Sequence, residues 1–226
     1  MIAQALQQVT VWILPILFAV TLHEAAHGYV ARLCGDRTAD RLGRVSLNPL
    51  RHVDPVGTIL VPGLGVLTGT FLFGWAKPVP VNFNALNHPR RDSVLVAAAG
   101  PGTNILLAAI SIALFRAVPY LPDTAMVWAA HNLANSFELN LILAVFNMLP
   151  LPPLDGGRVA VGILPKPLSR QLASVEPYGF AIIMAALFLL PMVGEALHLP
   201  LDLFRPLVLG PADWLGSLIS SVIGPV

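Results

Sequence analysis

The stretch that decides the fold is residues 9–33, VTVWILPILFAVTLHEAAHGYVARL. Its first two thirds are almost wholly apolar, with Pro15 as an expected bend, and the stretch exceeds the roughly 20 helical residues that cross a bilayer. Its last third carries His23, Glu24 and His27, ionisable groups that are costly inside a membrane and need partners. The sequence therefore predicts a membrane helix with a polar site near one end.

The composition of the whole chain agrees with a membrane protein. Of its 226 residues, 56% are hydrophobic and 11% are charged, whereas roughly a quarter are charged in a typical soluble domain. Apolar stretches long enough to cross a bilayer recur, at residues 9–33, 93–115, 126–149 and 178–199. We therefore expect an all-α polytopic membrane protein with about four transmembrane helices.

The connections between these spans have their own character. Residues 34–92 are rich in Gly, Pro, Asn and Arg, but residues 56–73 are apolar enough to suggest a re-entrant segment. Residues 77–82 read as a short edge β-strand able to pair with an extended peptide, or else as a surface loop. Asp155 to Arg158 is expected to form a turn.

The last segment, residues 201–226, is set apart from the core at residues 1–200. It is broken by Pro206, Gly210 and Pro211, and its apolar residues recur at helical spacing. This pattern favours an amphipathic helix at the membrane surface over a fifth span.

The positive charges predict an orientation. Most basic residues lie between the first and second spans or between the third and fourth, and the exceptions are Arg116 and Arg205. By the positive-inside rule, both connections are cytoplasmic and the N-terminus is outside. We expect an integral protein of a prokaryotic plasma membrane.

The sequence His23-Glu24-Ala25-Ala26-His27 has the spacing of a metal site. Two histidines four residues apart on a helix share one face, so both rings can bind one zinc ion. Glu24 lies beside them, where it can accept a proton from water activated by the metal. The alternative is a set of hydrogen bonds between helices, which does not explain why an apolar span tolerates three ionisable groups.

A catalytic zinc ion usually has three protein ligands, so a third is expected. Asp155 is the leading candidate, because it follows the third span on the same side of the membrane and is surrounded by Pro and Gly. Asp92 and Glu176 are more simply explained as charges at helix starts. His52 is a weaker candidate, and Cys34 is interpreted as a free thiol with a metal contact as the alternative.

Two separated motifs resemble those of the site-2 protease family of intramembrane metalloproteases. They are HEAAH at residues 23–27 and NMLPLPPLDGG at residues 147–157, and GPGTN at residues 100–104 also resembles a family motif. The resemblance is to compact members without a PDZ or CBS domain. It implies one Zn²⁺ per chain held by His23, His27 and Asp155, with Glu24 as the general base.

The same resemblance implies the reaction and its partners: hydrolysis of peptide bonds in transmembrane or membrane-adjacent segments, with the lipid bilayer and a membrane-protein substrate as partners and no nucleic acid. Asn147 and Asn104 are candidates to bind the substrate backbone, or else link helices. A silent relative that binds membrane partners and a metal transporter are less favoured. The first need not keep Glu24 and the ligands, and the second should carry polar groups through the full depth of several spans.

Overall fold

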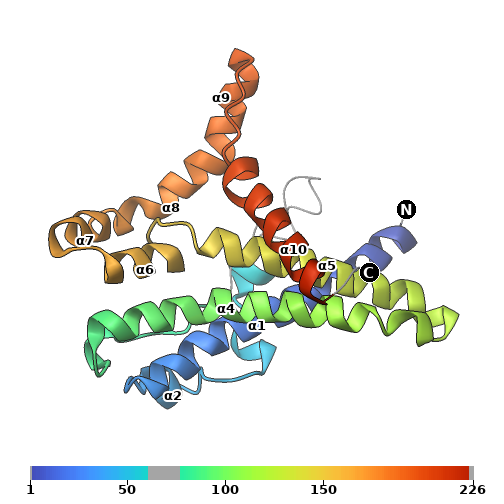
Figure 1. The fold of residues 1–226 in the computed structure, drawn as a ribbon, viewed down its shortest axis with the longest axis horizontal. Coiled ribbons are helices and arrows are strands. Elements are labelled where there is room, and N and C mark those ends of the chain that lie inside the picture. The colour runs from blue at the N-terminus through green and yellow to red at the C-terminus, as the bar shows by residue number, and fades with distance from the viewer. Residues whose placement is uncertain (1, 61–76, 224–226) are drawn as a thin grey trace.

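The computed structural model describes residues 2–60 and 77–223, and the regular elements of this part of the chain are all helices, with no strand (Figure 1). Its centre is a bundle of three long helices: α1 (Ile2–Leu33), α4 (Pro89–Phe115) and α5 (Asp123–Asn147). Helices α1 and α5 run in one direction and α4 runs against them. The short elements are α2 (Thr38–Arg41), η1 (Pro49–Arg51), η2 (Pro55–Leu60), η3 (Phe83–Ala85) and η4 (Val118–Tyr120).

The bundle is closely packed because small residues occupy its helix contacts. Ala19, Ala31, Ala108 and Ala144 are almost fully buried, and small side chains let helix backbones approach closely in a membrane. Polar groups are buried with them, and the interior therefore contains hydrogen bonds between helices as well as apolar contacts.

Two short helices follow the bundle, α6 (Asp155–Ile163) and α7 (Lys166–Ala173). The predicted turn at Asp155 to Arg158 is wrong, because these residues form the first turn of α6. Both Gly156 and Gly157 are required there, because a Cβ on either would lie 2.2 Å from the backbone of residues 148–152. Close packing thus outweighs the low helix propensity of glycine.

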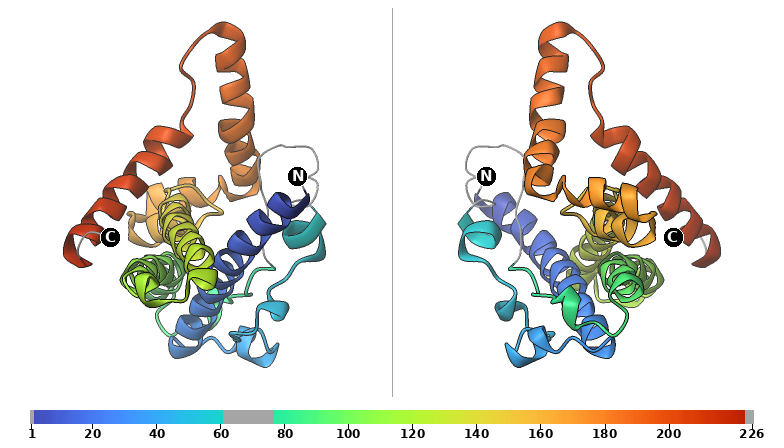
Figure 2. Two further views of the ribbon diagram at one scale, coloured as in Figure 1. Left: turned by 90° about the vertical axis from the view of Figure 1, so that its right-hand side faces the viewer. Right: turned by 90° about the vertical axis from the view of Figure 1, so that its left-hand side faces the viewer.

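The C-terminal part forms an arm that leaves the bundle (Figure 2). Helix α8 (Glu176–Met184), η5 (Ala185–Leu189) and α9 (Leu190–Leu197) continue one another, and η6 (Arg205–Leu209) with α10 (Gly210–Ile223) runs back. His198 ends α9 in the left-handed conformation, at φ 54°. Helix α10 packs on α5 through a cluster that includes Ala108, Leu141 and Ala212.

Four helices of the described part are long and apolar enough to cross a membrane: Thr10–Leu33 within α1, Pro89–Phe115, Glu176–Leu197 and Arg205–Ile223. The predicted third span, α5, is not among them, because it carries Asn132, Asn135, Glu138 and Asn140 among its apolar residues. The segment expected to lie on the membrane surface, in contrast, forms a helix of sufficient length and hydropathy to span.

The predicted β-strand at residues 77–82 is not supported by the structure. The backbone groups there bond mainly to side chains: Val79 N–H to Glu24, Asn82 N–H to Asp36, and the Lys77 and Pro78 carbonyls to Arg44. Pro78 and Pro80 also lack the N–H groups that a ladder needs. Of the predicted re-entrant segment at residues 56–73, only the beginning in η2 is described, and residues 61–73 lie outside the described part.

Candidate metal centre

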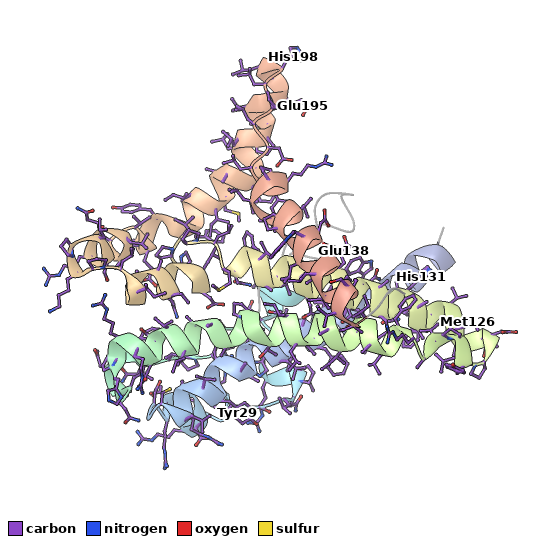
Figure 3. The ribbon with its side chains drawn as sticks, viewed as in Figure 1. Tyr29, Met126, His131, Glu138, Glu195 and His198 are labelled. Atoms are coloured by element: carbon purple, nitrogen blue, oxygen red, sulfur yellow. The ribbon has the colours of Figure 1, made fainter. Side chains whose placement is uncertain are left out.

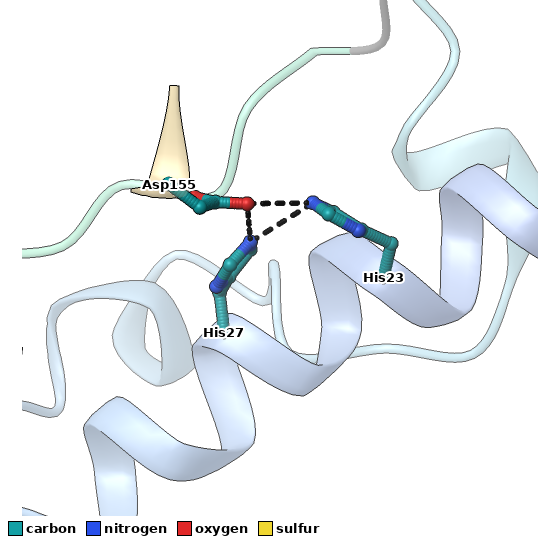
Figure 4. A group of neighbouring side chains, drawn as sticks. All are labelled: His23, His27 and Asp155. Atoms are coloured by element: carbon teal, nitrogen blue, oxygen red, sulfur yellow. Dashed lines mark hydrogen bonds and ion pairs between the residues drawn. The ribbon is translucent and has the colours of Figure 1, made fainter. Parts of the chain in front are cut away.

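Three side chains, two from α1 and one from a distant part of the sequence, meet at one point beside α1 (Figure 4). His23 and His27 are one helical turn apart, and their Nε2 atoms are separated by 3.1 Å. Asp155, the first residue of α6, places Oδ2 3.2 Å from His23 Nε2 and 3.4 Å from His27 Nε2. The structure therefore brings together the three residues that the sequence suggested as ligands.

The orientation of each histidine ring is set by α4. His23 Nδ1 lies 2.6 Å from Asn104 Oδ1, and His27 Nδ1 lies 2.6 Å from the backbone oxygen of Val96. The acceptor oxygens at both Nδ1 atoms favour a proton on Nδ1, which leaves each Nε2 lone pair facing Asp155. Second-shell acceptors of this kind orient metal-binding histidines.

The residues fit a zinc ion. Two lone pairs and a carboxylate oxygen face one another, and Asp155 Oδ2 is buried with no hydrogen-bond partner among the described atoms. Three acceptors without a shared proton repel one another unless a cation lies between them. A tetrahedral zinc ion with bonds of about 2.0–2.2 Å separates its ligand atoms by about 3.3–3.5 Å, close to the spacings found here.

The charge state of Asp155 suits this role. Burial alone would raise the pKa of its carboxyl group, but in the metal-free protein hydrogen bonds and charge from protonated His23 and His27 outweigh burial and hold the pKa well below its usual range. The carboxylate is therefore ionised at neutral pH, as a metal ligand must be.

Helix α4 approaches the site through Gly100. A Cβ at this position would lie 2.5 Å from His23 Cε1 and 2.5 Å from His27 Nε2. Any larger residue would fill the space between the rings. The first glycine of the GPGTN motif thus gives room to the histidine pair.

A cavity of about 190 Å³ opens beside the three ligands. Glu24 lines it, and the Glu24 Oε2 atom accepts a hydrogen bond from Val79 N–H at 2.8 Å. Asn147 also lines the cavity, and its Nδ2 donates to the Leu143 carbonyl at 3.0 Å. The other lining residues are mainly apolar and include Pro78, Val81, Phe83, Val96, Ala97, Pro153 and Leu154.

Asn104 lies elsewhere. It is fully buried, does not line the cavity, and contacts His23. Of the two asparagines suggested as substrate contacts, only Asn147 is thus in a position to meet a molecule in the cavity.

The other polar residues singled out by the sequence lie outside the cluster. His52 is buried and bonds to the Ser46 carbonyl, which supports its loop, and Asp92 accepts from His88 N–H at the start of α4. Cys34 is a free thiol, and burial and the Asp92 charge raise its pKa. His131 and Glu138 lie on α5 (Figure 3) and do not belong to the cluster.

Sequence reasoning missed two groups at the cavity. The first is the Val79 backbone N–H. The sequence signal for it was Pro78-Val79-Pro80, because the two prolines have no N–H and leave Val79 as the single donor of this stretch. The second is Arg158, which lines the cavity, stacks over the Phe83 ring at 5.2 Å and contacts Glu176 at 3.6 Å.

Comparison with known proteins gives a consistent result. Residues 121–190 match the family model described as peptidase family M50. The chain is 38% identical over 218 residues to YwhC of Bacillus subtilis, named as a candidate zinc metalloprotease, covering 95% of this chain and 93% of that protein. No solved structure shows a significant match.

Two mycobacterial proteins named Rip2, also candidate zinc metalloproteases, are more distant. The protein of Mycolicibacterium smegmatis is 31% identical over 172 residues, or 76% of this chain and 64% of its own length. That of Mycobacterium tuberculosis is 32% identical over 176 residues, or 77% of this chain and 65% of its own length. The similarity to both therefore covers less than two thirds of their length.

Proposed function

The chain belongs to peptidase family M50, the site-2 protease family, and from this we propose that it is a zinc-dependent endopeptidase that cleaves transmembrane or membrane-adjacent segments. The observation that carries the proposal is the convergence of His23 Nε2, His27 Nε2 and Asp155 Oδ2 beside a cavity lined by Glu24. These three residues would hold the metal. Bound zinc would supply the Lewis acidity that polarises a peptide carbonyl and makes water easier to deprotonate.

Glu24 would move the proton. One carboxylate oxygen is held by Val79 N–H, which leaves the other free to accept a proton from the attacking water. As the C–N bond breaks, Glu24 would return this proton to the leaving amine nitrogen. Atoms and charges balance, because water gives its hydroxyl to the carbonyl carbon and its proton to the amine.

The remaining lining residues would receive the substrate. A substrate helix hides its carbonyls in hydrogen bonds, so it must unwind locally before attack. Asn147 could offer an amide donor to the freed carbonyl, and the apolar side chains of Val79 and Val81 could contact the substrate side chains. Because Val79 N–H is already bonded to Glu24, it would not be available to the substrate backbone.

We also propose that the site faces the cytoplasm. The end of α1, the start of α4 and helices α6 and α7 lie at one end of the bundle (Figure 1), and these segments carry or adjoin most of the basic residues. The positive-inside rule then puts this end of the bundle in the cytoplasm. A prokaryotic plasma membrane and an outside N-terminus are parts of the same proposal.

The decisive variant is Glu24→Gln, which keeps the shape of the side chain and removes its basicity. We expect a loss of cleavage of about 100-fold or more, with unchanged zinc content of the purified protein. The matched control is Glu195→Gln at the tip of the arm (Figure 3), which should behave as wild type.

Cleavage can be followed without a known substrate. Membranes from cells that express the wild type or Glu24→Gln are compared by quantitative proteomics, and fragments of membrane proteins should appear with the wild type alone. Identical fragment patterns would reject the protease proposal in favour of a silent binding protein. A wild-type protein that purifies without zinc, and cannot be loaded with it, would reject the metal site.

A further inference from the structure

The two histidines of the metal centre are oriented by different kinds of acceptor. His27 Nδ1 meets the backbone carbonyl of Val96, whereas His23 Nδ1 meets the side-chain amide of Asn104. A backbone carbonyl can only accept a hydrogen bond. A carboxamide can present either its oxygen or its NH₂ group, so Asn104 cannot fix the His23 tautomer by itself.

The shortest hydrogen bond that orients the Asn104 amide comes from one step further away, on α5. Asn104 Nδ2 donates to Asn140 Oδ1 at 2.7 Å and, at the longer distance of 3.4 Å, to the backbone oxygen of Ala19. Asn140 Nδ2 in turn donates to the backbone oxygen of Ser136 at 2.8 Å and lies 3.3 Å from the Ser136 hydroxyl. Both asparagines are fully buried, at 0% exposure, so water cannot replace a lost partner. These hydrogen bonds form a continuous chain from α5 through α4 to the histidine on α1.

The donors and acceptors in this series of hydrogen bonds can be arranged in one direction only, because the series ends on the backbone carbonyl of Ser136. Since the Ser136 oxygen can only accept, Asn140 must turn its NH₂ group to it and its oxygen toward Asn104. Asn104 must then donate to Asn140 and offer its own oxygen to His23. His23 is left with its proton on Nδ1 and a free lone pair on Nε2.

The reverse direction would disable the ligand. A flipped Asn104 would place its NH₂ group against His23 Nδ1, and the ring proton would move to Nε2. That atom faces Asp155 Oδ2 at 3.2 Å, so a proton there would occupy the position that a metal ion needs.

We propose that Asn140 is a positioning residue for the metal centre: it sets the tautomer of His23 through Asn104 and so keeps His23 Nε2 free to bind zinc. The inference rests on the proposed zinc site but concerns a residue that contacts neither the ligands nor the cavity.

The first measurement is zinc affinity, determined by competition with a chelating dye on the metal-free protein in detergent. Asn140→Leu should weaken zinc binding about tenfold, as expected when an outer partner of a ligand is lost. The control is Asn132→Leu, which removes another buried amide from α5 whose Nδ2 donates to the Trp128 carbonyl of the same helix. Its zinc affinity should equal that of the wild type.

Repeating the Asn140→Leu change in the Asn104→Asp variant separates control of the His23 tautomer from an effect on packing. In Asn104→Asp, either carboxylate oxygen can accept from His23 Nδ1, and the ionised side chain has no donor to present. Adding Asn140→Leu to this variant should therefore cost no further zinc affinity. A tenfold loss in both backgrounds would mean that Asn140 supports packing only, and the proposal would be overturned.

The tautomer can also be read without metal. In nitrogen-15 spectra of the metal-free protein, the His23 signals, assigned by their loss in His23→Ala, should report a protonated Nδ1 in the wild type and a mixture in Asn140→Leu. An unchanged His23 tautomer in Asn140→Leu would reject the relay, that is, the control of His23 by Asn140 through Asn104. If the wild type gives the expected tautomer but binds no zinc, the proposed function fails while the relay stands. Should circular dichroism show that Asn140→Leu is unfolded, Asn140→Ala takes its place in every comparison.

Discussion

The bundle and the C-terminal arm are both apolar, but they use their surfaces in opposite ways. In the most apolar window of α4, 44% of the residues are buried within the protein, against 11% in the α8–α9 part of the arm. The bundle buries small residues and a chain of hydrogen bonds, whereas the arm exposes large side chains such as Phe180, Leu189 and Met192. Fixed geometry is therefore concentrated around the proposed metal site, whereas the arm leaves large apolar side chains exposed.

The largest effect is expected at the point where the bundle is tightest. Gly100→Ala would place a methyl group 2.5 Å from His27 Nε2 and should abolish zinc binding in an equilibrium titration. Gly102→Ala, two residues further along the same helix, meets nothing within 4 Å and should bind zinc as the wild type does. Retained binding in Gly100→Ala would mean that α4 can move away from the histidines.

A second variant tests the place where the arm meets the bundle. A Cβ at Gly179 of α8 would lie 1.7 Å from the Pro152 carbonyl, so Gly179→Ala should destabilise the protein by about 3 kcal/mol in thermal unfolding followed by circular dichroism. Gly210→Ala, where the nearest atom is at 3.5 Å, is the control on the other arm helix and should unfold near the wild-type temperature. Equal midpoints would show that the arm is not anchored at Pro152.

A pH effect is expected at the end of α1. Burial would raise the pKa of Asp36, but hydrogen bonds from Thr38 and Asn82 and the charge of Arg41 outweigh burial and lower the pKa. The resulting stability is present above the unfolded pKa of about 3.9 and is lost as the pH falls through the lower folded value.

Asp36→Asn should therefore cost about 2 kcal/mol at neutral pH, and its unfolding midpoint should converge with that of the wild type below the unfolded pKa of Asp36. Asp40→Asn is the control, because Asp40 is about half-exposed and its side chain contacts Arg32 at 3.4 Å. A constant difference between Asp36→Asn and the wild type across this pH range would contradict the assignment to Asp36.

The smallest effect is expected on the arm. Leu189 is 53% exposed, so Leu189→Ala should change stability in detergent by at most about 0.5 kcal/mol. Leu141→Ala, a matched change at a residue 4% exposed between α5 and α10, should cost about 2–5 kcal/mol. Similar losses in the two variants would remove the distinction between bundle and arm.

The metal cluster was accessible to sequence reasoning, and much of its environment was not. His23, His27 and Asp155 could be suggested because helical spacing and charge distribution are local patterns. The contact of Asn104 with His23 depends on the register of α4 against α1, which no local pattern fixes. The same holds for the contact of Asn140 with Asn104, which depends on the register of α5 against α4.

The errors in secondary structure have related causes. A glycine pair normally indicates a turn, but Gly156 and Gly157 begin a helix because backbone lies too close for any Cβ. The expected strand at residues 77–82 fails because Glu24, Asp36 and Arg44 take its hydrogen bonds. The C-terminal segment forms a helix of sufficient length and hydropathy to span, and its placement at the membrane surface stays a prediction.

The position of Asp155 at the start of α6 has a consequence for the lifetime of the protein. The ligands on α1 and α6 are separated by 128 residues of chain, from His27 to Asp155. An ion that binds all three would join these distant segments only in the folded chain, and it would stabilise the folded state by about 2.7 kcal/mol when free zinc is 100 times its dissociation constant. Zinc supply would then control how long the folded protein survives in its membrane, separately from how fast it works.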